Sequence, residues 1–304
     1  MIRVLASLLL LICFTLPSLA DEATFEEAMA LFSDGNYAEA KPIADAFAKK
    51  DDPRAFVMLG TMSQKGLGVE VDAPTAKLWF RKAADKGNVD GELAYGMMLL
   101  DGSLGDPNLA DGSAWLEKAA QADNVQAQYN LGLYDSGVYN NKPDWKQAFD
   151  WFQKAADKGL AEAQYNLALL YTDGRGVDKD MVQAANWFAK AATQGMPDAA
   201  LEYGVLVFRG EGVQKDETLG AKWLLVAANH GNAVAQNRMA KLYALGLGVT
   251  ADAVEAAKWN ILAKNGGRAD AELDGAAEKL DASILKQAQA RAAAFKPMAV
   301  PAKN

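Results

Sequence analysis

The sequence predicts an all-α fold, a right-handed α-α superhelix (solenoid) of 36-residue helix–turn–helix repeats. Six of the seven tryptophans follow one another at a constant spacing of 36 residues. Glycine recurs with the same period, as does a Lys-Ala-Ala motif that begins three residues after the tryptophan. A fixed period of this length is the sequence signature of stacked helical repeats. The tryptophans are Trp79, Trp115, Trp151, Trp187, Trp223 and Trp259, and the glycines are Gly87, Gly159, Gly195, Gly231 and Gly267.

The period divides the chain into six units, each with two predicted helices. A small residue, as at Gly60 and Gly132, recurs in the middle of the first helix. Because glycine in a helix costs about 1 kcal/mol relative to alanine, this recurrence indicates a close approach between helices. Neither helix could bury its apolar face alone, so neighbouring units are expected to stack. The units are 55–90, 91–126, 127–162, 163–198, 199–234 and 235–270.

The second helix of every unit is preceded by Asp or Asn. A short side-chain oxygen at this position accepts hydrogen bonds from the free N–H groups of the first turn, which stabilises the helix by about 1 kcal/mol. The periodic glycine then ends the helix, since it permits positive φ; Asp123 is the one exception among the six units. The predicted caps are Asp72, Asn108, Asp144, Asp180, Asp216 and Asp252.

The combined pattern, A-x-Y-x-L-G-x-x-Y-x-x-G-x-G-V-x-x-D-x-x-x-A-x-x-W-x-x-K-A-A-x-x-G, resembles the Sel-one-like repeat, a relative of the tetratricopeptide repeat. Residues 163–198 match it nearly throughout, and the resemblance covers 55–270. It implies a helical solenoid that scaffolds or regulates through partner binding, and many bacterial members are periplasmic or secreted. Some exported members are stapled by cysteines that this chain lacks, so their particular activities are not expected here.

Residues 1–20 have the pattern of a secretory signal peptide. Arg3 precedes an apolar run over residues 4–16, and the small residues Ser18 and Ala20 predict cleavage after Ala20. The only cysteine, Cys13, lies within this segment, so the mature chain would have neither disulfide nor thiol. We therefore expect a periplasmic protein, with secretion as the second choice, and no membrane insertion after cleavage.

The two ends of the repeat array are predicted to be caps, because terminal repeats are usually atypical. Residues 21–54 resemble a degenerate tetratricopeptide-like helix pair. Residues 271–295 lack the periodic tryptophan and glycine but remain strongly helical. Residues 296–304, which include Pro297 and Pro301, are expected to form a frayed, flexible tail.

The charge balance bears on the class of partner. The chain has 31 basic and 39 acidic residues, a formal net charge of −8, and loss of Arg3 with the signal segment would leave 30 against 39, or −9. An acidic chain without a basic run argues against nucleic-acid binding. We expect a monomer that binds a protein partner whose identity the sequence does not specify.

Few residues are present that could support catalysis. His230 is the only histidine, and its position in the repeat is otherwise filled by residues as different as Lys86 and Ala122, which indicates a solvated surface site. Zinc sites and nucleophile systems based on His or Cys lack their residues in the mature chain. The sequence predicts no enzyme activity, no metal and no cofactor.

A binding surface is expected on the first helices, which usually line the concave face of such a solenoid. Two columns of equivalent positions vary between units there: Phe56, Glu92, Gln128, Gln164, Ala200 and Gln236, and Met58, Ala94, Asn130, Asn166, Glu202 and Arg238. Amide side chains both donate and accept, so they could hold an extended peptide, although plain solubility explains the columns equally well. The candidate residues are Gln128, Asn130, Gln164, Asn166, Glu202, Gln236 and Arg238.

Unit 127–162 departs from the repeat pattern in its turn, residues 135–143, which has lost the G-x-G motif. The turn contains Tyr139 and is followed by Trp145, the one tryptophan outside the 36-residue period. Aromatic residues released from the packing pattern are candidate interface anchors. Trp145 could instead staple the start of its own helix or pack on the adjacent unit.

The predicted function is that of a non-catalytic periplasmic adaptor or regulatory protein that binds a partner on its concave face. One alternative is a cell-wall-associated protein that binds or remodels peptidoglycan. Another is a secreted effector that binds host proteins.

Overall fold

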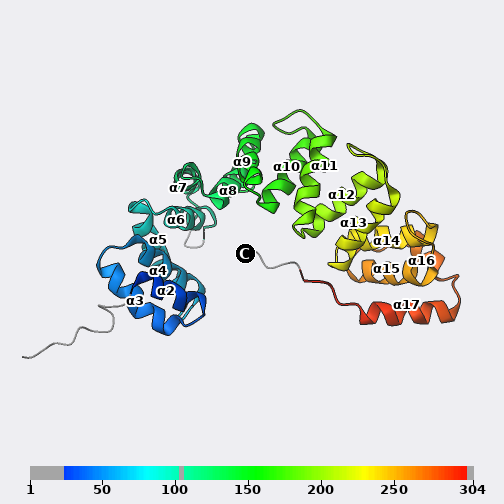
Figure 1. Cartoon of the computed structure of the whole chain (residues 1–304), viewed down its shortest axis with the longest axis horizontal. Helices are drawn as coiled ribbons and strands as arrows, with labels where there is room; N and C mark the ends of the chain where they lie inside the picture. The colour runs from blue at the N-terminus through cyan, green and yellow to red at the C-terminus, as the bar shows by residue number, and fades with distance from the viewer. Residues whose placement is uncertain (1–23, 103–105, 300–304) are drawn as a thin grey trace, which may run out of the picture. The chain divides into compact units, whose positions relative to one another are not determined.

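The computed structural model describes residues 24–102 and 106–299, and these contain sixteen α-helices and no strand. The expectation of an all-α chain of tandem helix pairs is therefore confirmed over the described residues (Figure 1). The predicted signal peptide and the end of the predicted tail, 300–304, lie outside them. The chain forms two compact units, which divide between Ala122 and Asp123.

The first unit contains three helix pairs. The pair before the periodic units occupies the region predicted to be a cap, and its helices are joined by a turn at 34–36. The helices are α2 (Phe25–Ser33), α3 (Tyr37–Lys49), α4 (Pro53–Lys65), α5 (Ala73–Asp85), α6 (Val89–Leu100) and α7 (Leu109–Gln121).

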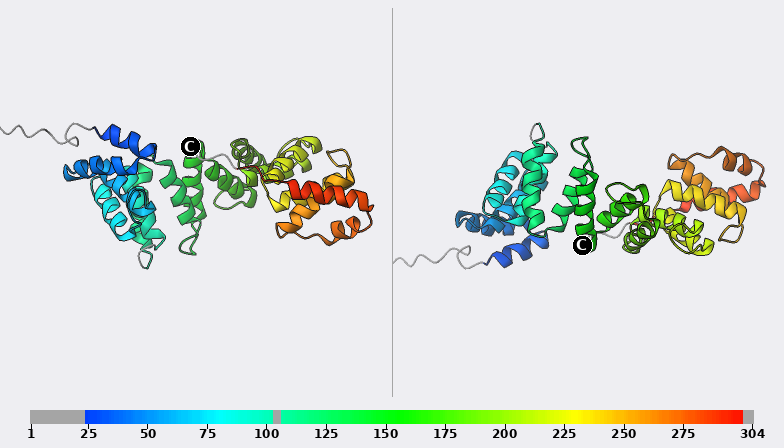
Figure 2. Two further views of the ribbon diagram at one scale, coloured as in Figure 1. Left: turned by 90° about the horizontal axis from the view of Figure 1, so that it is seen from below. Right: turned by 90° about the horizontal axis from the view of Figure 1, so that it is seen from above.

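The second unit contains four further helix pairs and two closing helices. In Figures 1 and 2, α17 lies alongside α15 at the C-terminal end of this unit. The helices are α8 (Val125–Asp135), α9 (Trp145–Asp157), α10 (Ala161–Asp173), α11 (Met181–Thr193), α12 (Pro197–Arg209), α13 (Glu217–Asn229), α14 (Ala233–Leu245), α15 (Ala253–Asn265), α16 (Ala271–Ala277) and α17 (Ala282–Ala294).

All six predicted caps are confirmed. Each side-chain oxygen accepts a hydrogen bond from a backbone N–H in the first turn of the following helix. At Asp180, for example, one carboxylate oxygen accepts from Val182 at 2.8 Å and from Gln183 at 3.0 Å. These bonds satisfy donors that the helix itself leaves free.

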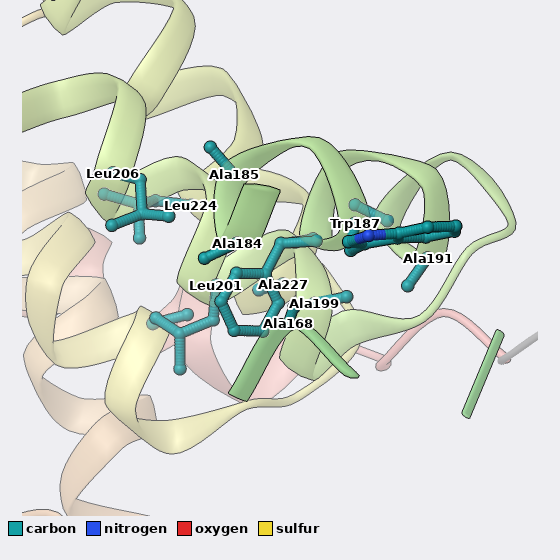
Figure 3. Close-up of a cluster of buried hydrophobic side chains, with 14 of the residues drawn as sticks. Ala168, Ala184, Ala185, Trp187, Ala191, Ala199, Leu201, Leu206, Leu224 and Ala227 are labelled. Atoms are coloured by element: carbon teal, nitrogen blue, oxygen red, sulfur yellow. The ribbon is translucent and has the colours of Figure 1, made fainter. Parts of the chain in front are cut away.

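The core is built from alanines and large apolar residues of both helices of each pair. Figure 3 shows one part of it, where Trp187 and Ala191 of α11 lie with Ala199 and Leu201 of α12. The lysine of each complete Lys-Ala-Ala motif lies over the periodic tryptophan of its own helix, at 3.5 Å from the ring centroid for Lys190. This contact shields the exposed side of a ring whose other side is packed.

Small residues in the first helices have the packing role that their recurrence predicts. A Cβ at Gly132 would lie 2.5 Å from the ring of Phe152, so only glycine lets α8 approach α9 this closely. Gly176 has a different role, because its φ is +71° and a Cβ there would lie 2.0 Å from the carbonyl oxygen of Trp145. The turn after α10 therefore packs directly on the first residue of α9.

Asp123, the exception among the periodic glycines, adopts the same left-handed backbone conformation, with φ +72°. Its carboxylate pairs with Lys158 at 2.6 Å. Asp51, one period before Gly87, also has positive φ and pairs in the same way with Lys86 at 2.6 Å. Asp is among the few residues other than glycine that tolerate this conformation.

The C-terminal residues that the structure describes differ from the expected frayed tail. After α17, Phe295 packs edge-on against Trp259, with ring centroids 5.6 Å apart. The N–H of Met298 donates to the carbonyl of Asn229 at 2.8 Å. The segment is therefore held as far as Met298 against the end of α13, because a free carbonyl in the last turn of this helix accepts the hydrogen bond.

Candidate protein-binding surface

The first of the two candidate columns lies in the core, so its placement outside the core was wrong. Gln128, Gln164 and Gln236 are each at most 5% exposed. The Nε2 groups of Gln164 and Gln236 donate to carbonyls in the last turn of the preceding helix, those of Ala156 and Ala228, both at 3.2 Å. These glutamines lie just after the turn between helices, so their amides reach the carbonyls that a helix end leaves free. They hold one repeat to the next.

The second column forms a polar ladder, which we define as Asn130, Asn166, Glu202 and Arg238. These residues occupy equivalent positions on α8, α10, α12 and α14 of the second unit. Asn130 is buried and the other three are half-buried. Asn166 donates through Nδ2 to the carbonyl of Glu162 on its own helix, at 2.9 Å. The charged part of the ladder is therefore Glu202 and Arg238, on neighbouring first helices.

Burial perturbs both charged members of the ladder. It raises the pKa of Glu202, and the positive charge of Arg238 opposes this rise. Burial lowers the pKa of Arg238, and the nearby Arg209 lowers it further. Among the described residues, neither side chain has an ion-pair partner within 4 Å, and the buried Nε of Arg238 has no hydrogen-bond partner. The ladder thus holds two partly desolvated charges of opposite sign, which attract one another without forming a direct ion pair.

Aromatic and acidic groups surround these charges. Burial raises the pKa of Tyr165 to about 12, and the negative charges of Glu202 and Asp198 contribute to this rise. Asp198 itself accepts a hydrogen bond from Asn232 at 2.9 Å. On the next repeat, Asp270 is held by Lys241 at 2.8 Å and by Asn237 at 3.1 Å. The neighbouring polar groups are thus paired with one another, while Glu202 and Arg238 form no direct ion pair.

The first unit has an apolar pocket at the equivalent face, and the sequence analysis did not single it out. The pocket has a volume of about 470 Å³, and Met58, from the same column as the ladder, lies in its wall. Arg54 at its rim stacks on Phe25 at 4.6 Å and pairs with Asp52 at 2.8 Å. The apolar lining residues are Phe25, Met29, Phe32, Val57 and Met58. The available signal was Met58, which stands where Asn130 and Asn166 stand in later repeats.

Tyr139 and Trp145 lie where the irregular turn meets α9. Trp145 is half-buried against the core of the second unit, and the guanidinium of Arg175 lies 5.0 Å from its ring centroid. Arg175 belongs to the turn of the following repeat, so Trp145 packs on the adjacent unit, which was one of its three expected roles. Tyr139 is half-buried within the turn itself. Neither residue joins the ladder.

Helix pairs joined by buried alanines and tryptophans, with a variable face on the first helices, define an α-solenoid repeat protein. Six consecutive segments, covering residues 49–267, match the Sel1 repeat, and the chain belongs to this family. Proteins with this repeat generally mediate protein–protein interactions. The matched segments are 49–88, 89–124, 125–160, 161–196, 197–232 and 233–267.

Two solved structures share both fold and sequence similarity with the chain. A protective antigen present in uropathogenic Escherichia coli strains, displaying an SLR fold, has a TM-score of 0.80 and 28% identity, over 91% of this chain and 62% of that one. A Sel1 repeat protein from Oxalobacter formigenes has a TM-score of 0.70 and 30% identity, over 80% of this chain and all of that one. The chain thus spans less than two thirds of the first of these relatives.

Three further findings bear on the class of protein. No curated protein matches the chain. Within the described residues, no helix is long and apolar enough to cross a membrane. The same part of the chain contains no group of three or more His, Cys, Asp or Glu side chains placed to hold a metal ion.

Proposed function

We propose that this chain is a non-catalytic periplasmic adaptor or regulatory protein that binds a protein partner through the polar ladder of its second unit. The observation that carries the proposal is the state of Glu202 and Arg238. Both are half-buried and charged, and neither has a partner of its own within ion-pair distance. Half-buried charges that attract one another only at a distance do not fully recover their desolvation cost, and a partner that forms direct ion pairs with them would reduce that cost.

The chemistry of the ladder defines the partner. Glu202 can accept from a Lys or Arg side chain, and Arg238 can bind a carboxylate in a bidentate manner. A partner segment that crosses α12 and α14 would therefore present one basic and one acidic side chain, in that order. Tyr165 on α10 adds an aromatic surface beside Glu202. Aromatic and arginine side chains are common among the residues that dominate binding energy.

Export to the periplasm is the second part of the proposal. It is supported by the charged start, apolar run and small-residue cleavage pattern of residues 1–20. The test is expression of the full chain in a Gram-negative host, followed by osmotic-shock fractionation and mass spectrometry of its N-terminus. We expect the released protein to begin at Asp21. Retention of an uncleaved chain in the cytoplasm would contradict the periplasmic location without bearing on the ladder.

The ladder is tested by site-specific photocrosslinking in intact cell envelopes. A photoreactive amino acid at Asn166 should give one dominant protein adduct, while the same amino acid at Lys222, exposed on the second helix α13, should not. Arg238→Glu should abolish the adduct from position 166, because it reverses the charge that the partner meets. Adducts that form equally from both positions, or that survive Arg238→Glu, would contradict binding through the ladder.

A further inference from the structure

The C-terminal segment is bound to the end of α13 through its backbone. Met298 donates its N–H to the carbonyl of Asn229 at 2.8 Å, and its own carbonyl lies 3.0 Å from Nδ1 of His230. A carbonyl can only accept, so this nitrogen of His230 carries the proton. Two adjacent residues of the repeat therefore hold both backbone polar groups of one residue, in the way that a peptide-binding site holds an extended ligand.

The position of His230 has a different role in other repeats. Lys86 reaches back to Asp51 at 2.6 Å, and Lys158 reaches back to Asp123 at 2.6 Å. Gln194 likewise donates to the carbonyl of Gly159 at 2.9 Å. These side chains connect the turn of one repeat to the turn of the preceding repeat, whereas the side chain of His230 contacts the carbonyl of Met298 in the C-terminal segment. At this repeat a stacking position holds an extended segment of chain instead.

Side-chain contacts fix how the segment enters the site. Phe295 is half-buried against Trp259, which anchors the segment to α15. The ring of Pro297 lies over Gly231, at van der Waals distance (3.5 Å) from the place where a Cβ would stand. Proline also holds its own φ near the extended value, and thus presents the N–H and carbonyl of the next residue for pairing.

The residues beyond Phe295 are held by little else. Lys296, Pro297 and Ala299 are exposed, and the Met298 side chain is 59% exposed. The segment thus contributes almost no buried apolar surface, and its two hydrogen bonds provide most of the attachment. A contact of this kind is readily exchanged, because a competing segment can form the same two hydrogen bonds.

We propose that Asn229, His230 and Gly231 form a second protein-binding site, which takes an extended Pro-x segment of a partner and which residues 296–299 of this chain occupy in its absence. The partner's proline lies against Gly231, and the residue after it is held through its N–H and carbonyl. Phe295 stays on Trp259 and acts as the fixed end of the displaced segment. The site is separate from the polar ladder, so either can fail without the other.

The test uses a chain that ends at Phe295, which keeps the contact with Trp259, and the peptide acetyl-Lys-Pro-Met-Ala-amide. Binding is followed by NMR through the imidazole signals of His230, which is the only histidine. We expect the shortened chain to bind the peptide about tenfold more tightly than the full chain, because the resident segment competes in the full chain. Circular dichroism of both chains checks that the fold is unchanged.

Two controls make the result specific. The peptide with N-methylmethionine lacks the N–H that pairs with Asn229, and His230→Ala removes the second hydrogen bond; each should abolish the shift or weaken binding about tenfold. Because His230→Ala removes the imidazole, binding to this variant is followed through the NMR signal of a backbone amide near residue 230. Gln194→Ala, at the equivalent position one repeat earlier, should leave binding unchanged. Equal binding by the full and shortened chains, or by the methylated peptide, would overturn the proposal.

Discussion

The two units of the molecule place different chemistry at the same position of the repeat. In the first unit, Met58 is 4% exposed and lines an apolar pocket. In the second unit, the equivalent positions hold Glu202 and Arg238, which are half-buried and charged. The surrounding scaffold is the same in both, with the same caps and the same close-packed second helices. The comparison shows that the repeat fixes where a side chain lies, and leaves its chemistry free for recognition.

The largest effect should come from the scaffold, and it should be equal in the two units. Phe80 and Phe152 are equivalent residues that are 1% and 2% exposed. Replacement of either by alanine should cost about 3–5 kcal/mol of unfolding free energy, because each leaves a large cavity. Hydrogen exchange followed by mass spectrometry can measure the loss separately in each unit. A clearly smaller loss in one unit would show that the two scaffolds are not equivalent.

The next largest effect should come from a substitution that gives a buried position of the first unit the charged residue found at the equivalent position of the second. Met58→Glu places a carboxyl in the wall of the apolar pocket, and we expect a loss of roughly 3 kcal/mol from the buried polar group and the lost packing. Met58→Leu is the matched control and should cost less than about 1.5 kcal/mol. Urea unfolding at neutral pH measures both. Similar losses for the two variants would show that the pocket is already solvated.

The caps should contribute smaller and equal amounts in both units. Asp72→Ala in the first unit and Asp180→Ala in the second each remove hydrogen bonds to the first turn of a helix. Each should cost about 1 kcal/mol, whereas replacement by asparagine should cost much less, because asparagine also caps. Hydrogen exchange of the following helix is the measurement. A loss confined to one unit would break the equivalence.

The smallest effect should be a gain in stability that depends on pH. Burial raises the pKa of Glu202 in the folded chain. Below the unfolded pKa of about 4.3 the group is neutral in both states and costs nothing, and the cost appears as pH rises through the folded pKa. Glu202→Gln should therefore raise the melting midpoint by roughly 2 °C at pH 7 and leave it unchanged at pH 4.

Two outcomes would change the interpretation of Glu202. A lower melting midpoint for Glu202→Gln at pH 7 would mean that the charge of Glu202 stabilises the fold, and would weaken the case for a binding role. The same gain at both pH values would mean that the effect does not come from ionisation. The exposed Glu27→Gln on α2 serves as the control and should show neither change.

Much of this structure could be predicted from the sequence because its signals are local and repeated. The Asx caps and positive-φ glycines depend on a few neighbouring residues, and six caps and five periodic glycines separate these signals from chance. The glutamine column shows the limit of this approach. Gln128, Gln164 and Gln236 are polar, and only the structure reveals their packing role. All three are buried, and Gln164 and Gln236 donate to carbonyls of the preceding helix.

The sequence by itself determined the period, the helix ends and the membership of a repeat family, since these follow from local backbone preferences and from residues at a constant spacing. The tertiary structure decided which surface positions are free to bind. Three features depend on contacts between different parts of the chain. They are the burial of the glutamines, the environment of Glu202 and Arg238 on neighbouring helices, and the hydrogen bond between His230 and Met298. Such contacts depend on how successive repeats pack, and no local pattern encodes them.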